Sequence, residues 1–129
     1  MFDDASPIYL QVAAQIEEQI LSGDLSGDDQ VMSTNAYAAF YRINPATAAK
    51  GVRQLADEGI LYKRRGLGMF VSPDAADRLR AKRRERFFAD RVEPMVAEAR
   101  MIGVPLDEIV KHIENARSGE GHDGRDANH

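Results

Sequence analysis

The chain has 129 residues, of which 43% are hydrophobic and 29% are charged, with a formal net charge of −4 and no cysteine. This length suits one small domain with an extension, and the lack of cysteine excludes disulfides and cysteine-based metal or iron–sulfur sites. No apolar run approaches the roughly 18 residues of a membrane-spanning helix, and the acidic start Met1-Phe2-Asp3-Asp4 is unlike a signal peptide, so we expect a cytoplasmic protein.

The first predicted helix begins at Ser6-Pro7 and ends at Gly23. Serine is a residue type that caps helices, and proline suits the first helical position, so Ser6 is the expected N-cap. The apolar residues of this segment recur at spacings of three and four, which places them on one face: Tyr9, Val12, Ile16 and Ile20. A polar loop, residues 24–30, follows.

Two short helices joined by a tight connection are predicted next. Ser33 caps the first, whose body is residues 36–41, and Asn44-Pro45 opens the second after the connection at residues 42–43. The second has one apolar face and ends at Gly59; that face is Ala48, Val52, Leu55 and Ala56. Two helices in this order are typical of a helix-turn-helix.

A β-hairpin completes the N-terminal unit. Residues 60–64 and 69–71 have the composition of strands, residues 65–68 contain two glycines and read as a turn, and Pro73 closes the segment. A helical pattern then covers residues 74–116, where Pro94 should kink or split the helix and Gly103 should end it before a last helix at residues 105–116. Residues 118–129 lack periodicity and are predicted to be disordered.

The expected fold class is mostly α, with an N-terminal winged helix-turn-helix of three helices plus a β-hairpin and a short helical extension of two to three helices for dimerisation. The expected domains are residues 1–73 for DNA binding, residues 74–117 for dimerisation and residues 118–129 as a tail.

The third helix carries the features of a DNA-reading helix. Thr47, Lys50 and Gln54 fall opposite its apolar face, with Ala46 and Arg53 beside them. Small residues allow a helix to enter the major groove, and cationic or amide side chains donate to bases and phosphates. Taken alone, this face also fits an ordinary solvated helix.

The hairpin favours the DNA interpretation. Lys63, Arg64 and Arg65 stand at its tip beside Gly66 and Gly68, where flexible backbone allows close approach to phosphates. The alternative is a charged edge that protects a small sheet from aggregation. The negative net charge is no obstacle, because DNA affinity depends on local positive surface.

The sequence also resembles the GntR-type regulators over residues 6–72. The resemblance is carried by Pro7-Ile8-Tyr9-Leu10-Gln11-Val12, Ile20, Gly23-Asp24-Leu25, the helix 45–52, residues 55–61 and residues 66–71; Asn44-Pro45-Ala46-Thr47-Ala48-Ala49-Lys50 and the short helical tail resemble the YtrA-type branch. It implies a winged-helix dimer acting on transcription. Departures are Asn35 where the family has arginine, and Pro45 and Ala49 where it has basic residues, so Lys50 should carry more of the contact.

The expected DNA-binding residues are Ser33, Asn35, Asn44, Thr47, Lys50, Arg53, Gln54, Lys63, Arg64, Arg65 and Gly66. The expected partner is a double-stranded DNA operator with an inverted repeat. An unidentified small-molecule effector could act only by changing the separation of the two recognition helices of a dimer, because the extension is too short for a sensor domain.

The extension predicts a homodimer. Its apolar band is too large for about 40 residues to bury, and an identical chain is the simplest partner. The expected interface residues are Phe87, Phe88, Val92, Met95, Val96, Ile102, Ile109, Val110 and Ile113. The alternative is packing of the band onto the N-terminal domain. The basic run between Arg78 and Arg86 is interpreted as a solvated helix face rather than a contact surface.

No catalytic, metal or cofactor site is predicted. His112 and Glu108 are one helical turn apart, a spacing that usually marks a surface pair, and Gly66-Leu67-Gly68 belongs to a hairpin instead of a phosphate-binding loop. We therefore expect a DNA-binding regulator, with repression as the expected sign, and not an enzyme. The alternative function is a helical dimeric module for protein–protein contact without sequence-specific DNA binding.

Overall fold

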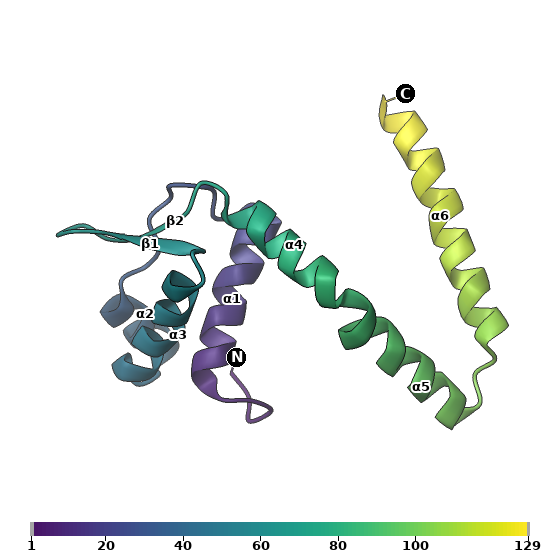
Figure 1. Ribbon diagram of the computed structural model, residues 1–129, viewed down its shortest axis with the longest axis horizontal. Helices are drawn as coiled ribbons and strands as arrows, with labels where there is room; N and C mark the ends of the chain where they lie inside the picture. The colour runs from purple at the N-terminus through teal and green to yellow at the C-terminus, as the bar shows by residue number, and fades with distance from the viewer. Residues whose placement is uncertain (1, 129) are drawn as a thin grey trace. The chain divides into compact units, whose positions relative to one another are not determined.

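The computed structural model describes the backbone of residues 2–128 and the side chains of residues 2–119. The elements in chain order are α1 (Ile8–Ser22), α2 (Thr34–Tyr41), α3 (Pro45–Asp57), β1 (Leu61–Arg64), β2 (Gly68–Val71), α4 (Ala75–Phe87), a π-helical turn η1 (Phe88–Val92), α5 (Glu93–Ile102) and α6 (Leu106–Asn128) (Figure 1). They form two compact units, Met1–Arg83 and Arg84–His129. The predicted fold class, mostly α with a winged helix-turn-helix and a short helical extension, is confirmed, whereas the dimerisation role of the extension stays a prediction.

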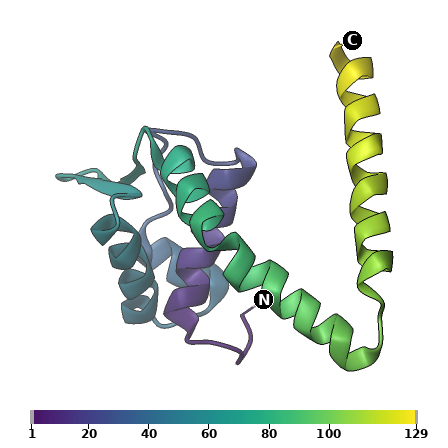
Figure 2. The ribbon, with the colours of Figure 1, turned by 45° about the vertical axis from the view of Figure 1, so that its right-hand side comes forward.

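The first unit is a three-helix domain with an antiparallel hairpin. In the hairpin, Leu61 pairs with Val71 and Arg64 pairs with Gly68, and the strands project from the helices (Figure 2). The core is built from one face of each helix together with the inner ends of both strands. Its fully or almost fully buried members include Val12, Ile16, Ile20, Ala48, Val52, Leu55, Ile60, Leu61, Val71, Ala75 and Leu79.

Helices α1 and α3 cross at very short distance at Gly51. A Cβ atom at this position would lie 2.7 Å from the carbonyl oxygen of Tyr9 and 2.9 Å from Cβ of Val12. Such contacts are closer than any real Cβ atom tolerates, so the crossing requires glycine. The crossing fixes which face of α3 is turned away from the core.

The helix ends follow the predicted capping, with one correction. Ser33 accepts a hydrogen bond from Ala36 N–H at 3.1 Å and Asn44 accepts one from Ala46 N–H at 2.7 Å, which confirms both caps. Ser6 was expected to cap α1, but Pro7 holds the cap position with extended backbone and no side-chain cap bond. The reason is that the Gln11 amide binds the Ser6 carbonyl at 2.8 Å and keeps Ser6 outside the helix.

The turn between α2 and α3 uses a left-handed residue. Arg42 has φ 57° and ψ 49°, and the N–H of Ile43 donates to the Ala38 carbonyl at 3.0 Å. The helix-turn-helix therefore closes through a single left-handed residue that is not glycine, a conformation that costs roughly 1–2 kcal/mol for a residue with a Cβ. The predicted tight connection at residues 42–43 is confirmed.

The first compact unit extends past Pro73, where the sequence placed the end of the DNA-binding domain. Ala75 and Leu79 of α4 are fully buried in its core. Lys82 and Arg83 form ion pairs with Glu17 of α1 at 3.6 Å each. The first part of α4 therefore completes the winged-helix core.

The regular α-helix of the second unit is interrupted just before Pro94, where the sequence predicted a kink or a split. The N–H of Glu93 donates to the Phe88 carbonyl, five residues back, and Pro94 stands in the first turn of α5. Proline cannot donate to the carbonyl four residues back, and the wider turn absorbs this defect. Gly103, with φ 77°, ends α5 as predicted.

Helix α6 is longer than the sequence pattern indicated. It continues to Asn128, whereas the last helix was expected to end at Ala116 and residues 118–129 to be disordered. No proline follows Pro105, so the backbone hydrogen bonds of the helix continue through this segment, although its glycines each disfavour the helix by about 1 kcal/mol. The side chains after Gly119, and residue 129 as a whole, lie outside the described residues.

The crossing at Gly51 generates a stability prediction. Gly51→Ala should lower the free energy of unfolding by about 1–3 kcal/mol, because the added methyl group collides with backbone and with Val12 in a packed core. Urea denaturation followed by circular dichroism measures this change. Arg53→Ala, at an exposed position of the same helix, should change stability by less than about 0.5 kcal/mol. Equal stabilities of Gly51→Ala and the wild-type chain would contradict the proposed constraint.

Candidate nucleic-acid interface

The exposed face of α3 differs in detail from the predicted one. Lys50 and Arg53 are exposed, as is Ala46, whereas Thr47 and Gln54 are only half-exposed. The Gln54 amide also lies 3.5 Å from the carboxylate of Glu58, which turns it along the helix. The centre of the exposed face is therefore Lys50 and Arg53, with Thr47 and Gln54 at its edge, because the crossing at Gly51 rotates the helix toward α1.

Lys50 is oriented by an aromatic ring of α1. Its ammonium nitrogen lies 4.0 Å from the centre of the Tyr9 ring, which is a cation–π contact. This contact restricts an otherwise flexible side chain at the exposed edge between α1 and α3. Tyr9 was expected only as part of the apolar stripe of α1, so the sequence analysis missed its contact with Lys50.

The N-terminal ends of α2 and α3 present polar side chains to solvent. Ser33, Asn35 and Asn44 are all exposed. The side-chain oxygens of Ser33 and Asn44 accept cap hydrogen bonds, so each keeps a donor, a hydroxyl proton or an amide N–H, for an anion. A helix N-terminus adds favourable electrostatics toward phosphate.

The tip of the hairpin is basic and solvent-exposed. Lys63, Arg64, Arg65 and Gly66 all lie on the surface. The guanidinium carbon of Arg64 stands 4.7 Å from the centre of the Phe70 ring, so this arginine is stacked across the hairpin. Gly66 has φ 77°, a conformation that favours glycine in the turn.

The hairpin is fastened to the domain by the loop that precedes α2. The Gln30 amide donates to the Leu67 carbonyl at 2.6 Å, and Val31 N–H donates to the Met69 carbonyl at 2.9 Å. At the other end, the Tyr62 hydroxyl donates to Asp28 at 2.7 Å, and this bond raises the pKa of the Tyr62 phenol. The loop thus pairs with β2 through an isolated bridge between Gln30 and Phe70, outside the two-stranded sheet. The sequence did not indicate this pairing, because residues 24–30 show no strand alternation.

The basic run on α4 is occupied by ion pairs within the chain. Lys82 binds Glu58 at 3.0 Å and Arg83 binds Glu18 at 2.8 Å, in addition to their contacts with Glu17. Arg78 binds Asp74 at 2.8 Å, and the hydrogen bond lowers the pKa of that carboxyl group. Arg78, Lys82 and Arg83 of this run therefore pair with acids of the first unit, and the interpretation of the whole run as a solvated helix face stays a prediction.

The predicted interface residues of the second unit differ in exposure. Val92, Val96 and Ile109 are half-buried within the unit. The other predicted interface residues are exposed: Phe87, Phe88, Met95, Ile102, Val110 and Ile113. Met101, at 79% exposure, and Leu106 add to this apolar surface, although the sequence analysis did not include them.

The described residues contain neither a metal-binding cluster nor a membrane-spanning helix. No group of three or more histidine, aspartate or glutamate side chains is arranged to hold a metal ion in this part of the chain. Likewise, none of the helices described is long and apolar enough to cross a membrane. His112, which the sequence paired with Glu108, is an exposed residue of α6.

No family model matches the chain, but individual transcription regulators are similar to it. The HTH-type transcriptional repressor YtrA of Bacillus subtilis is 27% identical over 110 residues, which cover 85% of this chain and 84% of YtrA. A GntR family transcriptional regulator from Listeria monocytogenes has the same fold, with a TM-score of 0.72 at 24% identity over 88% of this chain and 98% of that one.

A third similarity is confined to the first unit. The DNA-binding domain of AraR, solved in complex with an operator, superposes with a TM-score of 0.52 at 26% identity, covering 56% of this chain and 93% of that domain. The relatives are named as regulators and not as enzymes, in agreement with the expectation from the sequence. The chain is therefore similar to the YtrA repressor over most of both chains, and it shares the fold of a GntR family regulator.

Proposed function

We propose that this protein is a transcription repressor that binds an inverted-repeat operator as a homodimer. The observation that carries the proposal is the presence of two exposed basic surfaces on one small domain, Lys50 and Arg53 on α3 and Lys63 to Arg65 on the hairpin. Local positive surface of this kind is what attracts duplex DNA. The repressor name of the YtrA relative supports the sign of regulation.

In the proposed complex α3 enters the major groove. Ala46 near its start is small enough for close approach, and Lys50 and Arg53 follow one and two turns later with cationic donors. The ring of Tyr9 holds the Lys50 ammonium at the edge of α3 before DNA arrives, which reduces the conformational entropy lost on binding. Thr47 and Gln54 contribute from the edge of the helix.

The remaining predicted residues act on the backbone of the DNA. Ser33 and Asn35 at the start of α2, and Asn44 at the start of α3, supply neutral donors to phosphates. The hairpin supplies cations from Lys63, Arg64 and Arg65, with Gly66 keeping the turn narrow. These contacts position the protein and supply affinity, whereas base edges contacted by α3 supply sequence preference.

The second unit supplies the proposed dimer contact. Phe88 is 66% exposed and Ile102 is 63% exposed, and the same unit also exposes Met95, Met101, Val110 and Ile113. So many exposed large apolar side chains on a short unit are unusual on a monomer. A two-fold dimer would relate two α3 helices by one axis, so half-sites of the operator should lie roughly one helical turn apart. A small-molecule effector would release the operator.

Lys50 tests the recognition helix. If the ammonium group contacts a base edge, Lys50→Ala should weaken operator binding by about 1–3 kcal/mol. If it contacts phosphate, the variant should lose about the same binding free energy with the operator as with random duplex. Fluorescence anisotropy with a selected operator and with random duplex distinguishes the two cases. Lys111→Ala removes the same charge from α6 and should leave both affinities nearly unchanged. Unaltered operator affinity in a folded Lys50→Ala protein would refute the assignment.

The hairpin should contribute affinity more than specificity. Replacing Arg64 and Arg65 together with alanine should weaken operator and bulk DNA binding by the same factor and reduce the salt dependence of both by about two counter-ions. Binding isotherms at several salt concentrations measure these slopes. A double variant that kept its bulk affinity and lost only operator preference would show that the hairpin reads bases.

The dimer is tested in the full chain by exposed substitutions. Ile102→Glu combined with Ile113→Glu places charges in the proposed interface, at positions where the folded chain alone tolerates them. Sedimentation equilibrium should show a dimer for the wild-type chain at micromolar concentration and a monomer for the double variant. His112→Glu, an exposed neighbour, is the matched control. A wild-type chain that stays monomeric would overturn both the dimer and the inverted repeat.

A further inference from the structure

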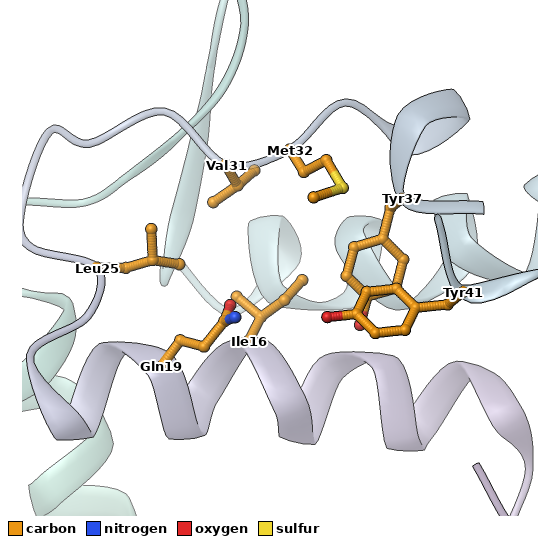
Figure 3. Close-up of a pocket in the computed structure, with 7 residues that line it drawn as sticks. All are labelled: Ile16, Gln19, Leu25, Val31, Met32, Tyr37 and Tyr41. Atoms are coloured by element: carbon orange, nitrogen blue, oxygen red, sulfur yellow. The ribbon is translucent and has the colours of Figure 1, made fainter. Parts of the chain in front are cut away.

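A cavity of about 150 Å³ lies inside the first unit, between α1, α2 and the loop that joins them (Figure 3). Its lining residues are Ile16, Gln19, Leu25, Val31, Met32, Tyr37 and Tyr41. None of these side chains carries a charge at neutral pH, and most of the lining is aliphatic or aromatic. The cavity therefore suits an uncharged and largely apolar occupant.

The size of the cavity limits that occupant to about one ring. An apolar cavity of about 150 Å³ is large enough to hold benzene. Tyr37 and Tyr41 close one side with their rings, whose centroids lie 4.5 Å apart, and Leu25 stands at the opposite side (Figure 3). Planar aromatic walls favour a planar guest over a branched aliphatic one.

The side-chain amide of Gln19 is the polar group of the lining that keeps both its donors and its acceptor for a guest. The two tyrosine hydroxyls are already bonded to Gln15, Tyr37 as donor and Tyr41 as acceptor at 3.0 Å, which leaves Tyr41 only its hydroxyl proton. The side-chain amide of Gln19, by contrast, makes no hydrogen bond to any group within the described part of the chain, although it is half-buried at the cavity. A half-buried amide gains by pairing with a donor or acceptor on a ligand.

We propose that this cavity binds a small uncharged molecule with one six-membered ring and one hydrogen-bonding substituent, which pairs with the Gln19 amide. We further infer that this molecule is the effector of the repressor, and that second step rests on the proposed function. The binding step stands on the cavity alone.

The position of the cavity connects it to the DNA-binding surface. Tyr37 and Tyr41 belong to α2, and Met32, which is 45% exposed at the cavity, immediately precedes the α2 cap residue Ser33. A guest that presses on these side chains acts on the helix whose N-terminus carries Ser33 and Asn35. By linkage, a ligand that changes operator affinity must have its own affinity changed by operator by the same factor.

Phenol is the probe for the binding step, in the full chain without DNA. It should cause saturable chemical-shift changes in the methyl groups of Ile16, Leu25 and Val31 and raise the unfolding temperature. Leu25→Trp, which fills the cavity, should abolish both effects. Leu21→Trp, at a half-buried position outside this cavity, should preserve them. Shifts that do not saturate, or that persist in Leu25→Trp, would overturn the site.

A second variant keeps the proposal testable even if Leu25→Trp does not fold. Gln19→Leu retains the shape of the cavity and removes only its amide. The Kd of phenol should then rise about three- to tenfold, the value of one hydrogen bond, while the Kd of toluene stays the same or falls. Equal changes for phenol and toluene would contradict the role of Gln19.

The effector step is measured separately with a selected operator. Saturating phenol should change the operator Kd of the wild-type chain and leave that of Leu25→Trp unaltered. If phenol leaves the operator Kd unchanged in both proteins, the effector step is overturned. Because operator binding is measured first in the absence of phenol, failure of DNA binding itself would be recognised independently.

Discussion

The contact of α1 with α3 at Gly51 is the constraint on which the candidate interface depends. Two helices whose backbones nearly touch can adopt few relative rotations, since any side chain at the crossing would collide with Tyr9 and Val12. The crossing thereby decides that Lys50 and Arg53 lie outward while Gln54 lies at the edge. It also brings the Tyr9 ring beside Lys50, so the packing of the core and the orientation of a surface cation have one cause.

A second constraint is the weakness of an isolated hairpin. Two strands of four residues are marginal in water unless a further element pairs with them. Here the loop before α2 pairs with β2 through Val31, and Gln30 holds the turn through the Leu67 carbonyl. The same loop also lines the cavity with Val31 and Met32. One segment thus supports the basic hairpin, leads into the cap of α2 and forms a wall of the cavity.

Features that depend on local chemistry could be predicted from the sequence, and features that depend on distant contacts could not. The caps at Ser33 and Asn44 follow from neighbouring residues, as does the end of α5 at Gly103. The end of the first compact unit depends on Leu79, a lone leucine in a basic segment with almost no amphipathic pattern, so nothing local indicates that it is buried. Gly51 gives no signal either, because a glycine can mark flexibility as readily as close packing.

The residues of the candidate site also divide into those that local sequence indicates and those that depend on distant contacts. The basic residues of α3 and of the hairpin tip were predictable, because their spacing and their adjacent glycines are visible in the chain. Their supports were not, because Tyr9 is 41 positions before Lys50 and Gln30 is 37 positions before the carbonyl that it binds. The rotation of α3 by a fraction of a turn is a tertiary effect, and periodicity alone cannot distinguish Gln54 from Arg53 as the outward residue.

The net charge of −4 looks unfavourable for DNA binding until the positions of the acids are considered. Glu17 is only 15% exposed and Glu58 is 32% exposed, and both are paired with cations of α4. These acids therefore project little field beyond the domain, because opposite charges at contact distance cancel at longer range. Lys82 and Arg83 of α4 are neutralised by the same contacts. Lys50, Arg53 and the three cations of the hairpin form no ion pair with an acid among the described residues, so a chain with an overall negative charge can still present a surface suited to phosphate.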